Sequence, residues 1–231
     1  MNIRPAALVA LALACTALPA SGQGVVVDPG QFEIFIDGQS AGSEDFVIRR
    51  ANLGLGAALF ANGTVTIARP AAASELRPLL RATPPDGQAE SYQIEVTGAG
   101  AMELRLARSA GRYVVTIRSR VGDEDREFQA RPDSRVLDLD VAHHYYFVRD
   151  LRVDRSTHVL EPRSRGQYAL TATDRVEEAL RVGPNVLQVR RVDFTSSDGL
   201  DRTVWYDRQG RVVRVAIPGR EYVAQRTDLV G

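Results

Sequence analysis

The stretch "GQSAG" at 38–42 has the G-x-S-x-G spacing of the nucleophile elbow of serine hydrolases. In that motif a strand enters a sharp turn that carries the serine, and a helix follows. A strand is predicted at 32–36, but the β-branched and aromatic residues at 43–49 predict a second strand where the helix should be. Asp37-Gly38 is also a favoured two-residue hairpin turn. We therefore interpret Ser40 as part of a β-hairpin that Asp37-Gly38 and Gly42 turn, and we assign no catalytic residue.

The histidines are the other residues whose chemistry could support catalysis or metal binding. His143 and His144 are adjacent, and adjacent side chains point in different directions on a helix or a strand, so they cannot easily converge on one ion. With His158 as the third histidine, no metal-ligand spacing is present, and no metal is predicted. Asp140 and His144 are four residues apart and could touch, so a hydrogen-bonded pair is as good an interpretation of them as a set of metal ligands. An acid and a histidine follow Ser40 in hydrolase order, for example Asp138 and His158, so a hydrolase stays as an alternative.

Aromatic and imidazole side chains are the candidates for ligand contact. His144 and Tyr145 lie in a mid-chain stretch, and Trp205 and Tyr206 lie in a C-terminal strand. Neighbours on a strand face opposite sides of the sheet, so one of Trp205 and Tyr206 should be in the core. We expect Trp205 in the core, with ligand contact as the second interpretation. These four residues are the predicted ligand-binding set, and no cofactor is predicted.

The charge balance excludes several functions. The chain carries 29 basic and 29 acidic residues, and every basic residue is arginine. Without lysine there is no Schiff base and no Ser-Lys dyad. Without a basic excess we expect no nucleic-acid partner.

The N-terminus predicts export. A short basic start at 1–4 is followed by an apolar run at 5–18 and by small residues, which is typical of a signal peptide at 1–22. We expect a periplasmic or secreted protein without a transmembrane segment. Lipidation at Cys15, which would give an outer-membrane lipoprotein, is the less favoured alternative. Cys15 is the single cysteine, so no disulfide is expected after cleavage.

Beyond the signal peptide, apolar and polar residues alternate with a period of two, which predicts half-buried antiparallel strands. Phe32, Ile34 and Ile36 are one example. Turn signals such as Asp37-Gly38 and Asn62-Gly63 separate the runs at short intervals. The pattern predicts a mainly β fold, a meander of roughly ten to thirteen strands, in one domain from 24 to 231.

Two segments break this alternation and predict one or two short helices. The stretch 138–151 gathers its apolar residues on one side of a helical wheel, and Asp140 is in place to cap its N-terminus. The stretch 174–182 is the second candidate, because Glu177 to Leu180 favour helix locally.

Three segments resemble a known class of protein: "FEIFIDGQSAGSEDFVI", "VLDLDVAHHYYFV" and "VWYDRQGRVVRVAIPG". They are similar to exported bacterial domains of unknown function that resemble the periplasmic lipoprotein carriers in fold. The resemblance implies a single strongly curved antiparallel meander sheet, a half-barrel or β-spiral, closed by one or two short helices. It also implies an apolar concave face for an acyl chain or a peptide segment.

Three functions follow as hypotheses. The favoured one is a non-catalytic exported binding or envelope-maintenance protein, a monomer whose partner is a lipid, a lipid-anchored ligand or an envelope protein. The second is a structural or interaction module that pairs an edge strand with a partner. The third is a serine or metal-assisted hydrolase.

Overall fold

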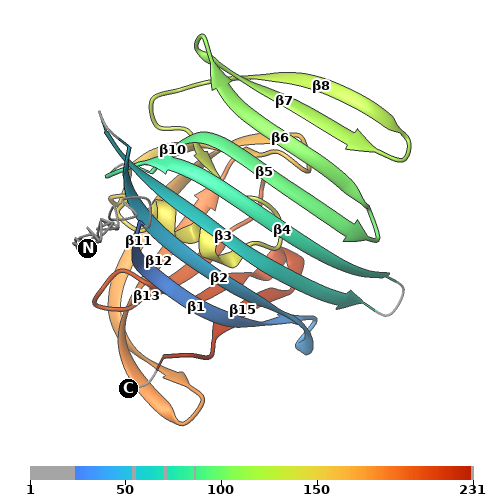
Figure 1. The fold of residues 1–231 in the computed structure, drawn as a ribbon. Coiled ribbons are helices and arrows are strands. Elements are labelled where there is room, and N and C mark those ends of the chain that lie inside the picture. Colours follow the sequence, from blue (N-terminus) through green and yellow to red (C-terminus); the bar gives the residue numbers. More distant parts are fainter. Residues whose placement is uncertain (1–23, 54–55, 70–71, 86, 230–231) are drawn as a thin grey trace, which may run out of the picture.

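The alternation of apolar residues becomes one continuous sheet of fifteen strands in the computed structural model (Figure 1). The structure describes residues 24–53, 56–69, 72–85 and 87–229. The expected signal peptide and Cys15 lie outside these residues. On β1, Phe32 and Ile34 point inward and are fully buried, as the period of two predicts. The mainly β prediction is confirmed. The strand count exceeds the expected number because strands as short as β9 show no alternation in the sequence.

The strands follow one another along the chain, with bounds as follows. They are β1 (Val25–Ile36), β2 (Gln39–Leu53), β3 (Gly56–Arg69), β4 (Ala72–Thr83), β5 (Gln88–Gly98), β6 (Met102–Ser109), β7 (Arg112–Ser119), β8 (Gly122–Gln129), β9 (Arg135–Val136), β10 (Ser156–Glu161), β11 (Gly166–Val182), β12 (Asn185–Ser196), β13 (Arg202–Tyr206), β14 (Val212–Ile217) and β15 (Tyr222–Arg226).

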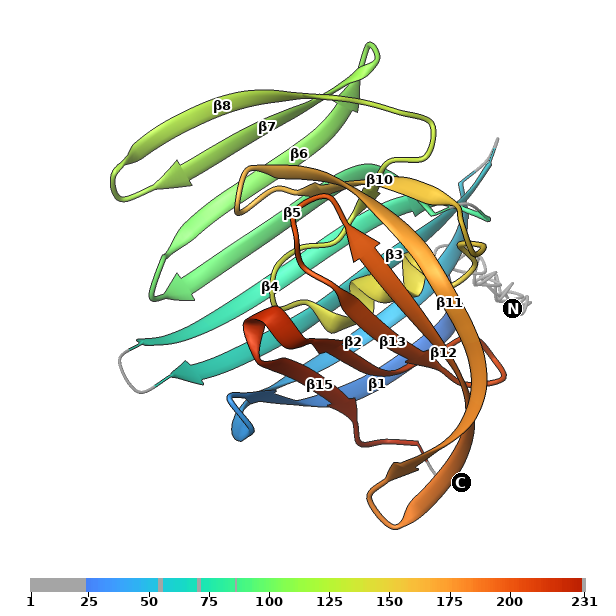
Figure 2. The same ribbon diagram turned by 180° about the vertical axis from the view of Figure 1, so that it is seen from behind.

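The sheet consists of two meanders joined at its middle. One runs from β1 to the edge strand β8, the other runs from β15 back to the edge strand β9, and β1 pairs with β15. The pairings are antiparallel except for that of β9 with β10. The sheet curls until β9 reaches the start of β5, where the Ala89 N–H donates to the Ser134 carbonyl at 3.1 Å. Strands β6 to β8 continue past this contact as a wing (Figures 1 and 2).

A short 3-10 helix, η1 (Ala142–Val148), occupies the space inside the curl (Figure 2). The predicted helix at 138–151 is therefore present but shorter, and its amphipathic character is wrong, because all seven residues are buried. Asp140 is not the cap. Val141 holds that position without a side-chain hydrogen bond, and Asp140, at a positive φ of 62°, pairs with Arg220 at 2.6 Å. A helix surrounded by sheet needs no polar face.

The second predicted helix, at 174–182, is wrong. These residues form the last part of β11, which pairs with β12 from Leu170 to Val182. Cross-strand partners such as Leu180 and Leu187 override the local helix preference of the glutamates. The other 3-10 segment in the described residues is η2 (Pro218–Arg220), which links β14 to β15.

Two glycines that were predicted to turn the chain lie inside strands. Asp37 and Gly38 do form the hairpin turn, with φ values of 52° and 69°. Gly42 is in β2 next to a register shift, where a Cβ would lie 1.9 Å from the Thr66 carbonyl oxygen. Gly63 is in β3, where a Cβ would lie 2.7 Å from the Asp45 carbonyl oxygen. Both glycines allow neighbouring backbone to approach closely, so their assignment to turns is wrong.

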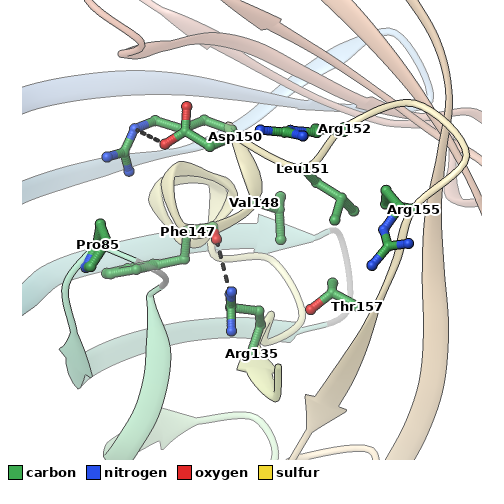
Figure 3. A pocket seen from close by; sticks show the side chains of 10 residues that line it. Pro85, Arg135, Phe147, Val148, Asp150, Leu151, Arg152, Arg155 and Thr157 are labelled. Atoms are coloured by element: carbon green, nitrogen blue, oxygen red, sulfur yellow. Dashed lines mark hydrogen bonds and ion pairs between the residues drawn. The ribbon is translucent and has the colours of Figure 1, made fainter. Parts of the chain in front are cut away.

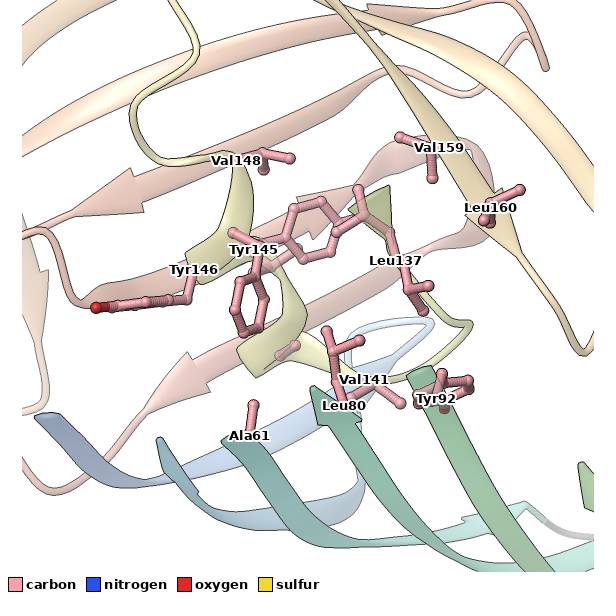
Figure 4. Packing of buried hydrophobic residues seen from close by; sticks show 14 of the residues in the cluster. Ala61, Leu80, Tyr92, Leu137, Val141, Tyr145, Tyr146, Val148, Val159 and Leu160 are labelled. Carbon is pink, nitrogen blue, oxygen red and sulfur yellow. The ribbon is translucent and has the colours of Figure 1, made fainter. Parts of the chain in front are cut away.

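The core is built by η1 and the inward faces of the strands around it. Figure 4 shows Val141 beside Leu80 and Tyr92. A small second cluster lies on the other face of the sheet, where Val182, Val189, Val213 and Leu229 are buried against Trp205. In the residues that the structure describes, no helix is long and apolar enough to cross a membrane.

Candidate functional site

The structure brings three of the four predicted ligand-binding residues together. His144 and Tyr145 on η1 and Tyr206 on β13 are buried, and the Tyr206 hydroxyl donates to the Tyr145 carbonyl at 3.0 Å. Trp205 faces the opposite side, where its indole N–H donates to Glu178 at 2.5 Å. Tyr206 takes the place in the main core, whereas Trp205 is half-buried against the second hydrophobic cluster. The three buried residues are enclosed by protein, and their role as ligand contacts stays a prediction.

Ser40 lies at the start of β2, directly after the hairpin turn, so the predicted hairpin is confirmed. Its hydroxyl is exposed and donates to Glu33 at 2.9 Å on the paired strand β1. A serine nucleophile needs a base such as histidine within hydrogen-bond reach, and the carboxylate of a triad orients that histidine instead of contacting the serine. The geometry at Ser40 is that of a cross-strand polar pair.

A different serine lies next to a histidine. The Ser134 hydroxyl is 3.1 Å from Nδ1 of His158, and both side chains are buried. The same hydroxyl accepts the backbone N–H of Arg131 at 2.9 Å, and the Asp133 carboxylate accepts the backbone N–H of His158 at 3.2 Å. The acid thus contacts the backbone and not the imidazole. These bonds fix the turn before β9, and they do not form a Ser-His-Asp triad.

The other two histidines belong to a buried polar cluster, defined here as Glu44, Tyr92, Asp138, His143, His144 and Arg163. Glu44, on β2, accepts the backbone N–H groups of Ala142 and His143 at 2.7 and 2.9 Å. It also lies 2.5 Å from Nδ1 of His143. Because a carboxylate offers only acceptors, Nδ1 of His143 is the donor in this contact. Glu44 therefore supplies the acceptors for the start of η1 that the sequence assigned to Asp140.

His144 is held as a neutral ring. Its Nδ1 accepts the Asp138 backbone N–H at 3.2 Å. Burial, and then the neighbouring His143, hold the pKa of His144 well below its ordinary value. Nε2 of each ring is buried without a hydrogen-bond partner among the described residues. The interpretation of Asp140 and His144 as a pair is wrong, because Asp140 turns to Arg220 instead.

Asp138 organises the other half of the cluster. Its carboxylate accepts from the Tyr92 hydroxyl at 2.6 Å and from Nε of Arg163 at 2.8 Å. Burial, and then the Asp138 charge, raise the pKa of Tyr92 well above its ordinary value. In the part of the chain that the structure describes, no three His, Cys, Asp or Glu side chains are placed to hold a metal ion. The cluster satisfies buried charges and joins η1 to the sheet.

An opening with a volume of about 610 Å³ lies at the C-terminal end of η1. We call it the arginine pocket (Figure 3). Its lining residues come from the β4–β5 turn, β9, η1, the loop at 149–155 and β10. They are Pro85, Arg135, Phe147, Val148, Arg149, Asp150, Leu151, Arg152, Arg155 and Thr157. The volume is within the range of ligand sites, about 300–1,000 Å³.

The pocket combines an apolar wall with positive charge. Phe147, Val148 and Leu151 form the wall that η1 and its following residues provide. Figure 3 shows Arg135 and Arg155 reaching toward the opening from β9 and from the loop before β10. An apolar wall with a few convergent charged groups is the usual composition of a site for small organic ligands.

Sequence reasoning missed both Glu44 and the arginine pocket. Glu44 shares the phase of Phe46 and Ile48 on β2, so the period of two already placed it on the inward face. The stretch "RDLRVDR" at 149–155 has an arginine at every third position. The sequence could not show that the β4–β5 turn, β9 and β10 complete the pocket around that stretch.

Comparison with known proteins gives a likeness in fold. The chain is similar to the crystal structure of a beta-barrel-like protein of domain of unknown function DUF1849 from Brucella abortus, with a TM-score of 0.52 and 10% identity, over 89% of this chain and 97% of that one. It also matches a DUF1089 family protein from Pseudomonas aeruginosa, with a TM-score of 0.43 and 13% identity, over 77% and 90%. No family model and no curated protein matches. The curled sheet is thus one that a β-barrel-like domain of unknown function also adopts.

Proposed function

We propose that the protein is an exported, non-catalytic binding protein of the bacterial envelope, and that it holds a lipid-like ligand in the arginine pocket. The observation that carries the proposal is the cavity of about 610 Å³ with the apolar wall of Phe147, Val148 and Leu151. Its apolar wall can cover part of an acyl chain, and its volume suits one such molecule. The resemblance to lipoprotein-carrier-like domains is in keeping with this function.

The proposal differs from the sequence-based hypothesis in where the ligand sits. The concave face was expected to hold an acyl chain, but η1 covers that face with seven buried residues. A ligand would have to displace η1 and break the contacts of Glu44 with Ala142 and His143. The arginine pocket is open without such a rearrangement.

The alternative of an interaction module that adds a strand to a partner has less support. The edge strand β8 carries four carboxylates against one arginine: Asp123, Glu124, Asp125 and Glu127 with Arg126. Charged residues on an edge strand oppose pairing with another chain. The other edge, β9, is only two residues long.

Native mass spectrometry of the protein purified from its own envelope, combined with lipid extraction, tests the proposal. We expect an additional mass that matches an extracted lipid. The variant Leu151→Trp places a large ring at the wall of the pocket and should lose this mass. Leu79→Trp is the matched control, because Leu79 is 41% exposed on β4 and lies outside the pocket. Protein without any bound lipid, or equal lipid on both variants, would overturn the proposal.

A further inference from the structure

We infer that the arginine pocket selects an anionic amphiphile, a molecule with an acyl chain and a phosphate or carboxylate head group. This inference rests on the proposed function and names the ligand class for that site. The head group would bind to the guanidinium groups of Arg152 and Arg155, and the chain would lie along Phe147, Val148 and Leu151.

The charge of the lining is the first argument. Among the described residues that line the pocket, four are arginines and one, Asp150, is an acid. The chain as a whole has a formal net charge of zero, so this concentration is local. Asp150 offsets little of it, because its carboxylate is 75% exposed and 3.4 Å from Arg149.

Two of the arginines are held at the pocket wall by backbone carbonyl groups. Nε of Arg135 donates to the Phe147 carbonyl at 3.3 Å. Arg149 donates to the Tyr146 carbonyl at 2.8 Å, lies over the Tyr146 ring and is 3.4 Å from the Asp150 carboxylate. We therefore assign the head group to the other two arginines.

The other two arginines have their charged groups available. In the residues that the structure describes, the side chains of Arg152 and Arg155 make no hydrogen bond and no ion pair. Both are exposed at the pocket. A guanidinium presents several N–H donors in a plane, which match a phosphate or a carboxylate.

The loop that carries these two arginines is held in place from the sheet. Arg175 on β11 donates to the Leu151 carbonyl at 2.5 Å, and Arg190 on β12 donates to the Arg149 carbonyl at 3.2 Å. The Asp154 N–H donates to the Ala172 carbonyl at 2.8 Å. A site on a pre-organised loop loses little conformational entropy when an anion binds.

The pocket favours an amphiphile over a free anion or an extended polyanion. A free phosphate would use the arginines and leave Phe147 and Leu151 without a partner. A nucleic acid or an acidic peptide would need positive charge spread along a face, whereas here it surrounds one cavity that has an apolar wall.

Three probes separate these ligands: dodecyl phosphate, dodecyl maltoside as a neutral amphiphile of equal chain length, and inorganic phosphate. Each is titrated below its critical micelle concentration into protein produced with its own leader, and binding is followed by calorimetry. We expect dodecyl phosphate to bind at least about tenfold more tightly than either of the other probes.

Variants assign the selectivity to the loop. The double variant Arg152→Gln/Arg155→Gln should bind dodecyl phosphate about tenfold or more weakly, and its affinity for dodecyl maltoside should be unchanged. The control is Arg105→Gln/Arg118→Gln on the wing, which removes the same charge away from the pocket. Unfolding curves verify that both double variants are folded.

The outcomes separate the inference from the function on which it rests. If both amphiphiles bind with equal affinity, the pocket does not select an anionic head group. The same conclusion follows if both double variants lose the same affinity for dodecyl phosphate. In either case the lipid-binding proposal stands. If inorganic phosphate binds as tightly as dodecyl phosphate, the acyl chain adds nothing to the affinity, and the inference that the ligand is an amphiphile is wrong. If neither amphiphile binds, the proposed function fails as well.

Discussion

The Glu44 carboxylate lies 2.5 Å from Nδ1 of His143, and both side chains are fully buried. Glu44 is on β2 and His143 is on η1, which are separated by about a hundred residues of chain. Because the same carboxylate accepts the first backbone N–H groups of η1, one strand residue fixes both the start of the helix and the ring that packs on Phe46. We regard this contact as the main polar link between η1 and the sheet.

Replacing Glu44 should destabilise the fold strongly. Glu44→Gln removes the negative charge from a site with three donors and leaves at least one of them without an acceptor. A buried donor that loses its acceptor costs about 1–3 kcal/mol, and more where the acceptor was a carboxylate. We therefore expect the free energy of unfolding, measured with urea, to fall by about 2 kcal/mol or more.

The control for this substitution is Glu103→Gln on the exposed face of β6, which should change the free energy of unfolding by less than about 0.5 kcal/mol. Equal effects of the two substitutions would show that Glu44 does not hold η1.

His144 should make stability depend on pH. Burial keeps its pKa in the folded protein well below the ordinary value near 6.5, so the unfolded chain takes up a proton first as the pH falls. The contribution of His144 to the free energy of unfolding is fully present above about pH 7 and is lost progressively as the pH falls below about 6.5. The slope approaches about 1.4 kcal/mol per pH unit for one histidine. His158, whose pKa is also lowered by burial, acts in the same direction.

Urea unfolding between pH 7.5 and 5 tests this prediction. His144→Gln can still accept the Asp138 N–H but does not titrate, so it should flatten the decline, and His158→Gln should do so as well. An unchanged slope in His144→Gln would mean that the pKa of His144 is not lowered in the folded protein.

Gly42 should be intolerant of a side chain. Gly42→Ala would place a Cβ 1.9 Å from the Thr66 carbonyl oxygen, and relief requires β2 and β3 to separate locally. We expect a loss of about 1–3 kcal/mol, the usual cost of overpacking. At Gly56 a Cβ would meet nothing within 4 Å, so Gly56→Ala is the control and should be nearly neutral. Similar unfolding midpoints for both variants would contradict this account of the strand.

The serines should be unreactive. A fluorophosphonate probe should label neither Ser40 nor Ser134, because the Ser40 hydroxyl donates to the Glu33 carboxylate and Ser134 is buried in a turn. Ser40→Ala should leave dodecyl phosphate binding unchanged. Labelling of either serine in the folded protein, identified by peptide mass spectrometry, would revive the hydrolase hypothesis.

The fold was largely predictable, because a period of two is a local signal. Phe32 and Ile34, or Asp37-Gly38, can be interpreted without knowing the rest of the chain. The stretch 174–182 and Gly63 were not predictable in this way. The stretch 174–182 is a strand because it pairs with β12. Gly63 is needed because the Asp45 backbone lies close to it. Both contacts exist only in the folded chain.

The site was less predictable than the fold. His144 and Tyr145 were singled out by type, and they lie in the core that η1 creates. The arginine pocket needs residues from β9 and β10 and from the turn before β5, which no spacing in the sequence relates to one another. Glu44 is the exception, since its phase on β2 placed it inward beside Phe46.

A crystal structure of the protein with dodecyl phosphate tests the central claim most directly. The account predicts the phosphate within hydrogen-bond distance of the guanidinium groups of Arg152 and Arg155, the chain along Phe147 and Leu151, and η1 in its present place. A chain between η1 and the concave face, with the contact of Glu44 and His143 broken, would contradict it.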